Sequence, residues 1–160
     1  MSQYTVVREY RYPIEEVWHV LTDPEYVAQW TTTGRGGRPE GYAAVVGTKF
    51  RFVGKPTMGW AGVVYCEVTD VDAPRTLRYT WRGDEDSNAI TDVTYLLEPI
   101  AGGTRFTWTH TGFTGPGGFA MSKLLGNVRR KMLTEGVPPI LAAHHAARSA
   151  RRPEAGGRTG

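Results

Sequence analysis

Alternation of apolar and polar side chains predicts a series of β-strands along the chain. In residues 4–12, Tyr4, Val6 and Tyr10 share one face of such a strand and mostly polar residues share the other. Turn residues separate five further segments of the same kind: residues 48–53, 60–71, 76–82, 91–98 and 103–111. Because the links between these segments are short, we expect neighbouring strands to pair antiparallel.

Helical spacing appears after the first strand and again near the end of the chain. Pro13 stands at a helix start, and the Asp23-Pro24 pair caps and opens a second short helix that ends near Trp30. Later apolar residues recur at helical spacing: Met121, Leu124, Leu125, Val128, Met132, Ile140 and Leu141. Since prolines 138 and 139 lack N–H donors, we expect a kink or break within residues 134–139.

The connection over residues 31–47 contains too much glycine to be regular throughout. We expect a long, mobile loop with at most a short strand at residues 42–46. Its Arg35 and Arg38 have two interpretations, contact with a ligand carboxylate or plain solvation, and we favour solvation.

The inward faces of the predicted strands form a strongly aromatic surface. Each large ring has two interpretations, plain core or the wall of a cavity. So many flat side chains on one concave face favour a pocket. The residues predicted to line it are Trp30, Phe50, Phe52, Val64, Cys66, Tyr79, Trp81, Tyr95, Phe106, Trp108, His110, Leu125, Val128 and Met132.

Four segments of the chain are distinctive: YPIEEVWHVLTDPEYVAQW, VVGTKFRF, GVVYCEVTDVDAPRTLRYTW and DVTYLLEPIAGGTRFTWTHTGF. Through them the chain, over roughly residues 6–143, resembles the START-like, or SRPBCC, superfamily. Within it the chain is most similar to the branch of activators of the heat-shock chaperone ATPase, whose bacterial members are often polyketide-cyclase-like. It implies an α+β helix-grip fold: a curved antiparallel sheet of six to seven strands wrapped around a long C-terminal helix, with two short helices after the first strand. The superfamily shares no catalytic residue set, so fold alone does not give function.

This resemblance and the aromatic face together predict a protein that binds an apolar or aromatic small molecule, lipid-like or polyketide-like, between sheet and helix. Two alternatives stay open. One is a cyclase-like or dehydratase-like enzyme on a polyketide-type substrate, or an antibiotic self-resistance protein. The other is a chaperone-interacting module, which needs an exposed apolar patch and no open cavity.

Candidate chemistry is sparse. His110 and Tyr95 are weak candidates for moving protons, and for His110 a hydrogen-bonded structural role is the main alternative. A dyad of Cys66 with His110 is a remote option, because a lone interior cysteine usually behaves as a small hydrophobe. The adjacent His144 and His145 point about 100° apart on a helix, so we predict no metal and no cofactor.

The charge distribution separates the chain into a neutral body and a basic end. The net charge of +3 comes entirely from the arginines of residues 148–160, which we expect to be a disordered, solvated tail after a single domain over residues 1–147. A tail of this kind does not provide the basic face that nucleic acid needs. One cysteine and no long apolar run predict a cytoplasmic protein without a membrane span, and the many Gly, Ala, Arg and Pro residues favour a bacterial source. We expect a monomer or homodimer.

Overall fold

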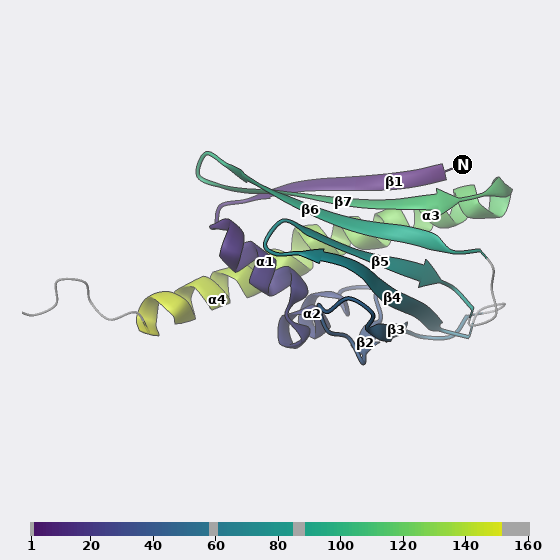
Figure 1. The fold of residues 1–160 in the computed structure, drawn as a ribbon, viewed down its shortest axis with the longest axis horizontal. Helices are drawn as coiled ribbons and strands as arrows, with labels where there is room; N and C mark the ends of the chain where they lie inside the picture. Colours follow the sequence, from purple (N-terminus) through teal and green to yellow (C-terminus); the bar gives the residue numbers. More distant parts are fainter. Residues whose placement is uncertain (1, 58–60, 85–88, 152–160) are drawn as a thin grey trace, which may run out of the picture.

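Seven antiparallel strands form one curved sheet in the computed structural model, which describes residues 2–57, 61–84 and 89–151 (Figure 1). The strand order is β1-β7-β6-β5-β4-β3-β2, so the first and the last strand along the chain pair with each other. Their bounds are β1 Ser2–Tyr10, β2 Arg38–Glu40, β3 Lys49–Val53, β4 Val63–Asp72, β5 Thr76–Arg82, β6 Thr91–Ile100 and β7 Gly103–Phe113. This sheet, with its C-terminal helix, is the predicted helix-grip fold.

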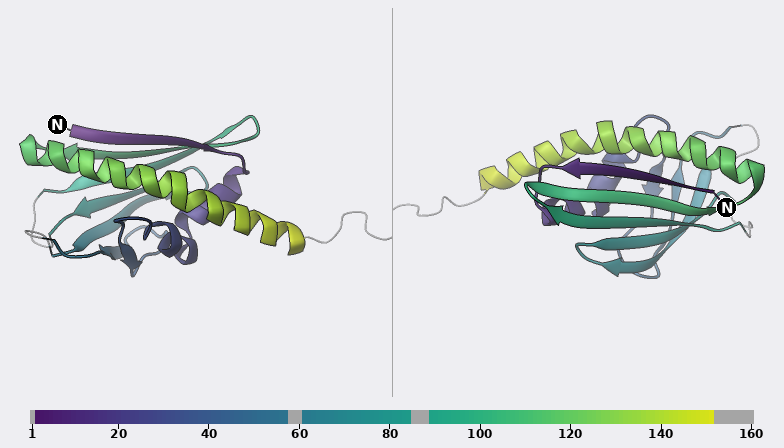
Figure 2. Two further views of the ribbon diagram at one scale, coloured as in Figure 1. Left: turned by 180° about the vertical axis from the view of Figure 1, so that it is seen from behind. Right: turned by 90° about the horizontal axis from the view of Figure 1, so that it is seen from above.

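One long C-terminal helix lies across one face of the sheet (Figure 2). It consists of α3 (Gly115–Lys131), a π-helical turn η1 (Met132–Gly136) and α4 (Val137–Arg151), and it contacts β1 through α3. The two short helices α1 (Ile14–Thr22) and α2 (Pro24–Trp30) follow β1, as predicted, and pack against α4. Within the described residues, no helix combines the length and apolar character that crossing a membrane requires.

The irregularity expected near the two prolines takes the form of η1, and the helix continues through it. The Val137 N–H bonds to the carbonyl of Met132, five residues back. In this register the carbonyl of Leu133 would next meet Pro138, which has no N–H. The Tyr10 hydroxyl donates to the Leu133 carbonyl at 2.6 Å instead. A buried tyrosine of β1 thus satisfies the acceptor that the proline leaves without a partner.

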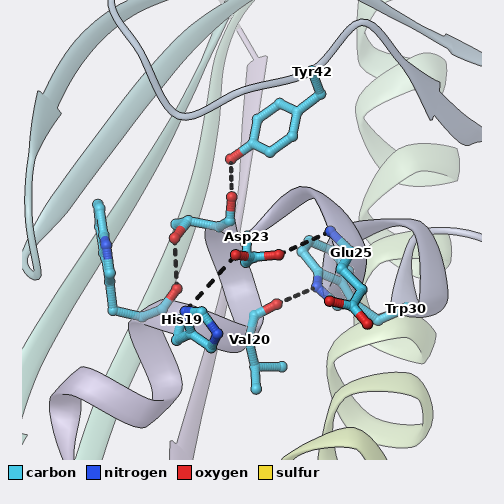
Figure 3. Close-up of polar contacts among 8 residues, drawn as sticks. His19, Val20, Asp23, Glu25, Trp30 and Tyr42 are labelled. Carbon is cyan, nitrogen blue, oxygen red and sulfur yellow. Dashed lines mark hydrogen bonds and ion pairs between the residues drawn. The ribbon is translucent and has the colours of Figure 1, made fainter.

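Polar contacts fix the junction between α1 and α2 (Figure 3). The Asp23 side chain accepts from the Glu25 backbone N–H at 2.9 Å and so caps α2, as the sequence predicted. The Trp30 indole N–H donates to the Val20 carbonyl at 3.0 Å. From the following loop, the Tyr42 hydroxyl donates to a carbonyl at the end of α1 at 2.8 Å. These bonds hold the two helices as one unit beside the sheet.

The short edge strand lies earlier than expected. It is β2, at Arg38–Glu40, and residues 42–46 are irregular. Glu40 pairs with Arg51 of β3 at 2.7 Å, and a Cβ on Gly37 would stand 3.1 Å from the Val53 backbone. The ion pair and the close backbone approach therefore favour pairing of residues 38–40 with β3. The apolar residues at 42–46, where the sequence suggested a short strand, do not pair.

The buried face of α3 differs from the predicted one by about one helical position. Met121 and Leu124 are exposed, whereas the helix buries Ser122, Gly126 and Arg129. The reason is close packing on β1: a Cβ on Gly126 would stand 3.4 Å from the Tyr4 side chain. Small residues let the helix approach the strand closely. Apolar spacing alone does not identify these positions as buried.

The basic end of the chain begins as helix. Helix α4 continues to Arg151, so residues 148–151 of the predicted tail are helical, with exposed side chains. Residues 152–160 of that tail, and residue 60 at the predicted start of a strand, lie outside the described residues.

Candidate functional site

The inward faces of β3, β5, β6 and β7 carry aromatic rings that contact one another. The rings contact one another mainly edge to face, for example Phe50 with Tyr79 at 5.2 Å, Tyr79 with Tyr95 at 5.9 Å and Tyr95 with Phe106 at 5.3 Å between centroids. Most of the predicted lining residues are buried: Trp30, Phe50, Phe52, Val64, Cys66, Tyr79, Tyr95, Phe106, Trp108, His110 and Met132. Three are only half-buried: Trp81, Leu125 and Val128.

The half-buried residues mark an edge where the interior reaches the surface. Trp81 of β5 lies on the sheet side of this edge, and Leu125 and Val128 lie on the helix side. The exposed apolar face of α3 begins beside them, with Met121 and Leu124 at 46% and 47% exposure. These three are the predicted lining residues that solvent partly reaches.

Two clefts described by the structure lie away from this interior. One, of about 380 Å³, lies between β1 and α3 and is mostly polar, with Tyr4, Ser122, Gly126 and Arg130 among its walls. The other has a similar volume and lies on β3 and β4 near Glu40, sharing only Phe50 with the predicted lining. Neither cleft is the predicted pocket.

Arg129 of α3 is the functional candidate that the sequence analysis missed. Only 3% of the residue is exposed, and its guanidinium carbon lies 3.8 Å from the centroid of Trp108 and 5.8 Å from that of Trp81. Its Nη1 donates to the Met132 sulfur at 2.8 Å, and its Nε has no hydrogen-bond partner. Among the described residues, no carboxylate forms an ion pair with it. One signal was available: Arg129 follows Leu125 by four residues and precedes Met132 by three, and both of these were placed on the inner face.

His110 is fully buried in a hydrogen-bond chain that defines its tautomer. The Thr91 hydroxyl donates to the Trp81 carbonyl at 3.1 Å, so it must accept from His110 Nε2 at 2.7 Å. His110 Nδ1 then accepts from the Tyr4 hydroxyl at 3.1 Å. Burial, and secondarily the Arg129 cation, lowers the pKa of His110 to about 3. The imidazole is therefore neutral, with both nitrogens occupied, which favours the structural alternative over a general base.

The other weak candidates for chemistry are protonated. Burial raises the pKa of the Cys66 thiol well above its ordinary value, and it likewise raises those of the Tyr79 and Tyr95 hydroxyls, which lie 3.4 Å apart. Cys66 lies on β4, with β5 and β6 between it and the β7 residue His110. No activated nucleophile arises from this arrangement.

A second polar cluster lies between α1 and α4. Glu16 is 3% exposed, and both of its carboxyl oxygens lie 3.1 Å from His145 Nδ1. His144 Nδ1 lies 3.4 Å from the same carboxyl group. The two histidines therefore share a carboxylate, although they diverge on the helix. Within the described parts of the chain, no group of three or more side chains has the arrangement of a metal site.

Comparison with known proteins supports the fold and the family. The family model described as activator of Hsp90 ATPase homolog 1-like protein matches residues 11–131. The chain belongs to this family. Protein MLL2253 from Mesorhizobium loti is 25% identical, with a TM-score of 0.73 over 89% of this chain and 98% of that one. No curated protein sequence matched the chain.

Two further solved structures share the fold at lower identity. An HSP90 activator from Plasmodium falciparum is 18% identical with a TM-score of 0.63, covering 84% of this chain and 92% of that one. DynU16, a protein of the dynemicin biosynthetic locus, is 22% identical with a TM-score of 0.65, covering 86% of this chain and 49% of that one. These likenesses place the chain in the START-like fold predicted from its sequence.

Proposed function

We propose that this family member binds an apolar or aromatic small molecule between the sheet and α3. The observation that carries the proposal is a contrast in what fills the interior. The strands contribute stiff rings such as Trp108, whereas the helix contributes Arg129 and Met132. Both helix side chains are long and unbranched, so they adapt to a guest more readily than packed rings do. A flat ligand would replace them against the indole faces.

The half-buried edge supplies the route to that space. Leu125 and Val128 of α3 and Trp81 of β5 are the lining residues that remain partly accessible. A ligand that passes between them reaches Trp108 without separating any strand pair. DynU16 belongs to a biosynthetic locus and shares this fold, which supports a polyketide-like guest as one chemical class to test.

A neutral fluorescent probe tests the proposal. We expect N-phenylnaphthylamine to bind with a dissociation constant of ~1–10 μM, about −7 to −8 kcal/mol, and to receive energy from the tryptophans. Val128→Phe adds volume at the entrance and should weaken binding about tenfold or more, ~1.4 kcal/mol. Val7→Phe makes the same change at an exposed position of β1 and serves as the control.

Absence of saturable binding would contradict the proposal. So would binding that Val128→Phe leaves unchanged while circular dichroism shows a native fold. Displacement of the probe by flat apolar competitors, with recovery of tryptophan emission, would support it and would begin to define the ligand's size.

A second candidate function follows from the exposed apolar face of α3. Phe119, Met121 and Leu124 are 54%, 46% and 47% exposed, a pattern typical of a protein-binding face. A chaperone-interacting module would use this face, in line with the family and with the similarity to the Plasmodium falciparum activator. The triple change of these residues to serine should then abolish stimulation of an Hsp90 ATPase and leave probe binding intact. No stimulation by the unaltered protein would reject this candidate.

A further inference from the structure

We infer that the ligand of this interior carries an anionic group, a carboxylate or its equivalent, that pairs with Arg129; the inference rests on the proposed function, binding between sheet and α3. Two buried N–H donors point to such a group. Arg129 Nε and Trp108 Nε1 both lack a hydrogen-bond partner, and the guanidinium lies 3.8 Å over the Trp108 ring. One ligand oxygen pair placed beside the guanidinium would serve donors that the protein itself leaves unpaired.

The protein provides little compensation for this buried charge. The attraction of a guanidinium to a desolvated indole is weaker than the cost of burying an unpaired ion. The thioether sulfur of Met132 is a weak acceptor. The Tyr4 oxygen gives its proton to His110, and its lone pairs lie near the Arg129 and Trp108 donors, but a neutral phenol supplies no charge to balance the guanidinium. The cation is therefore under-solvated, and an added anion would gain a strong interaction.

Among the described residues of the interior, no titratable group becomes this anion near neutral pH. Burial raises the pKa of Tyr79, Tyr95 and Cys66, so these groups stay protonated. His110 is neutral. The missing negative charge must then come from outside this set of groups.

Several other arginines of the chain form ion pairs with carboxylates. Even on the surface, several have carboxylate partners: Arg38 and Arg51 with Glu40, Arg78 with Asp70, and Arg105 with Glu9. Exposed pairs of this kind contribute little to stability. Arg129 is buried and has no carboxylate partner among the described residues, which is the arrangement expected of a residue whose partner is a ligand.

The same geometry restricts the ligand's shape. An arginine fork binds a planar carboxylate through two parallel hydrogen bonds. The indoles of Trp81 and Trp108 beside it offer flat apolar faces. The expected class is therefore an aromatic acid, with its ring plane against the indoles and its acid group toward Arg129.

Two probes with one skeleton separate charge from shape. Anilinonaphthalene sulfonate differs from N-phenylnaphthylamine only by the sulfonate. We expect the unaltered protein to prefer the anionic probe by about tenfold or more. Arg129→Gln should lower the affinity for the anionic probe by at least that factor and should change the affinity for the neutral probe less than about threefold. Arg129→Lys, which keeps the charge and loses the fork, should give an intermediate result.

Arg130→Gln is the matched control, because it removes the same charge from the next position, where the side chain is exposed and bonds Asn127. It should leave both affinities unchanged. Equal affinity for the two probes, equal weakening of both by Arg129→Gln, or the same loss in Arg130→Gln would overturn the inference while the binding function stands. Failure of both probes to bind the unaltered protein would overturn the binding function as well. Raising the salt concentration should weaken a buried pair little, and a strong salt dependence would indicate a surface site and reject it.

Discussion

Glu16 and Arg129 are both buried charges contributed by helices, and the structure gives them opposite surroundings. Each residue is 3% exposed. Glu16 is shared by two histidines of α4, whereas Arg129 meets two indole faces, a thioether and a neutral tyrosine hydroxyl. Because breaking a buried pair is costly and an unpaired ion already carries its penalty, the first charge supports the fold and the second weakens it. The difference separates a structural charge from one retained for binding.

The largest expected effect on stability comes from Trp108, the ring against which Arg129 packs. Trp108→Ala removes a fully buried ring that also packs on Trp30 and Tyr95, and it should cost ~3–5 kcal/mol of unfolding free energy. Trp18→Ala, at a half-buried position of α1, should cost clearly less. Chemical denaturation measures both. Equal losses would mean that the aromatic layer is not the main core of the domain.

Glu16→Gln tests the structural half of the comparison. It keeps the shape of the side chain but loses the charge shared by His144 and His145, and it should lower the free energy of unfolding by ~1–3 kcal/mol at neutral pH. Glu15→Gln is the control, one residue away and exposed. In a double-mutant cycle with His145→Ala, the two losses should be less than additive. Full additivity would show that the contact does not contribute to stability.

His110→Gln gives a pH-dependent effect. The native pKa of about 3 lies below the ordinary 6.5, so as the pH falls through this window the unfolded chain takes up a proton that the native protein does not. The unaltered protein should lose ~1.4 kcal/mol per pH unit from this group, and the variant should not. The gap between their unfolding free energies should therefore narrow from about pH 6 to pH 4. A constant gap would mean that native His110 accepts protons as freely as in the unfolded chain.

The smallest effect on stability is the most telling for Arg129. Arg129→Met replaces an unpaired cation by an apolar side chain of similar length, so the melting temperature should stay within a few degrees or rise. Affinity for anilinonaphthalene sulfonate should fall in the same variant. A clear loss of stability would mean that Arg129, like Glu16, supports the fold.

Alternation along the strands was enough to predict the sheet and its buried face. Trp108 and His110 lie two residues apart, and both are fully buried. The same reasoning missed Arg129, because an arginine on a helix is normally assigned to solvent. Apolar spacing also predicted that Met121 rather than Ser122 would be buried. It does not take account of Gly126, whose small size lets the helix pack closely against Tyr4. The hydroxyl partners of His110 come from β1 and the start of β6, which local sequence does not bring together.

The π-helical turn sets the angular phase between the two ends of the C-terminal helix. In a straight α-helix, at ~100° per residue, Arg129 and His145 would point roughly 160° apart. The turn at Met132–Gly136 absorbs about one residue of rotation, ~100°, and leaves them roughly 60° apart. A single helix therefore presents one residue to the sheet and the other to α1. Deleting one residue from this turn would give an ordinary helix with the same phase, whereas an ordinary helix that kept every residue would rotate the Glu16 partners by ~100°.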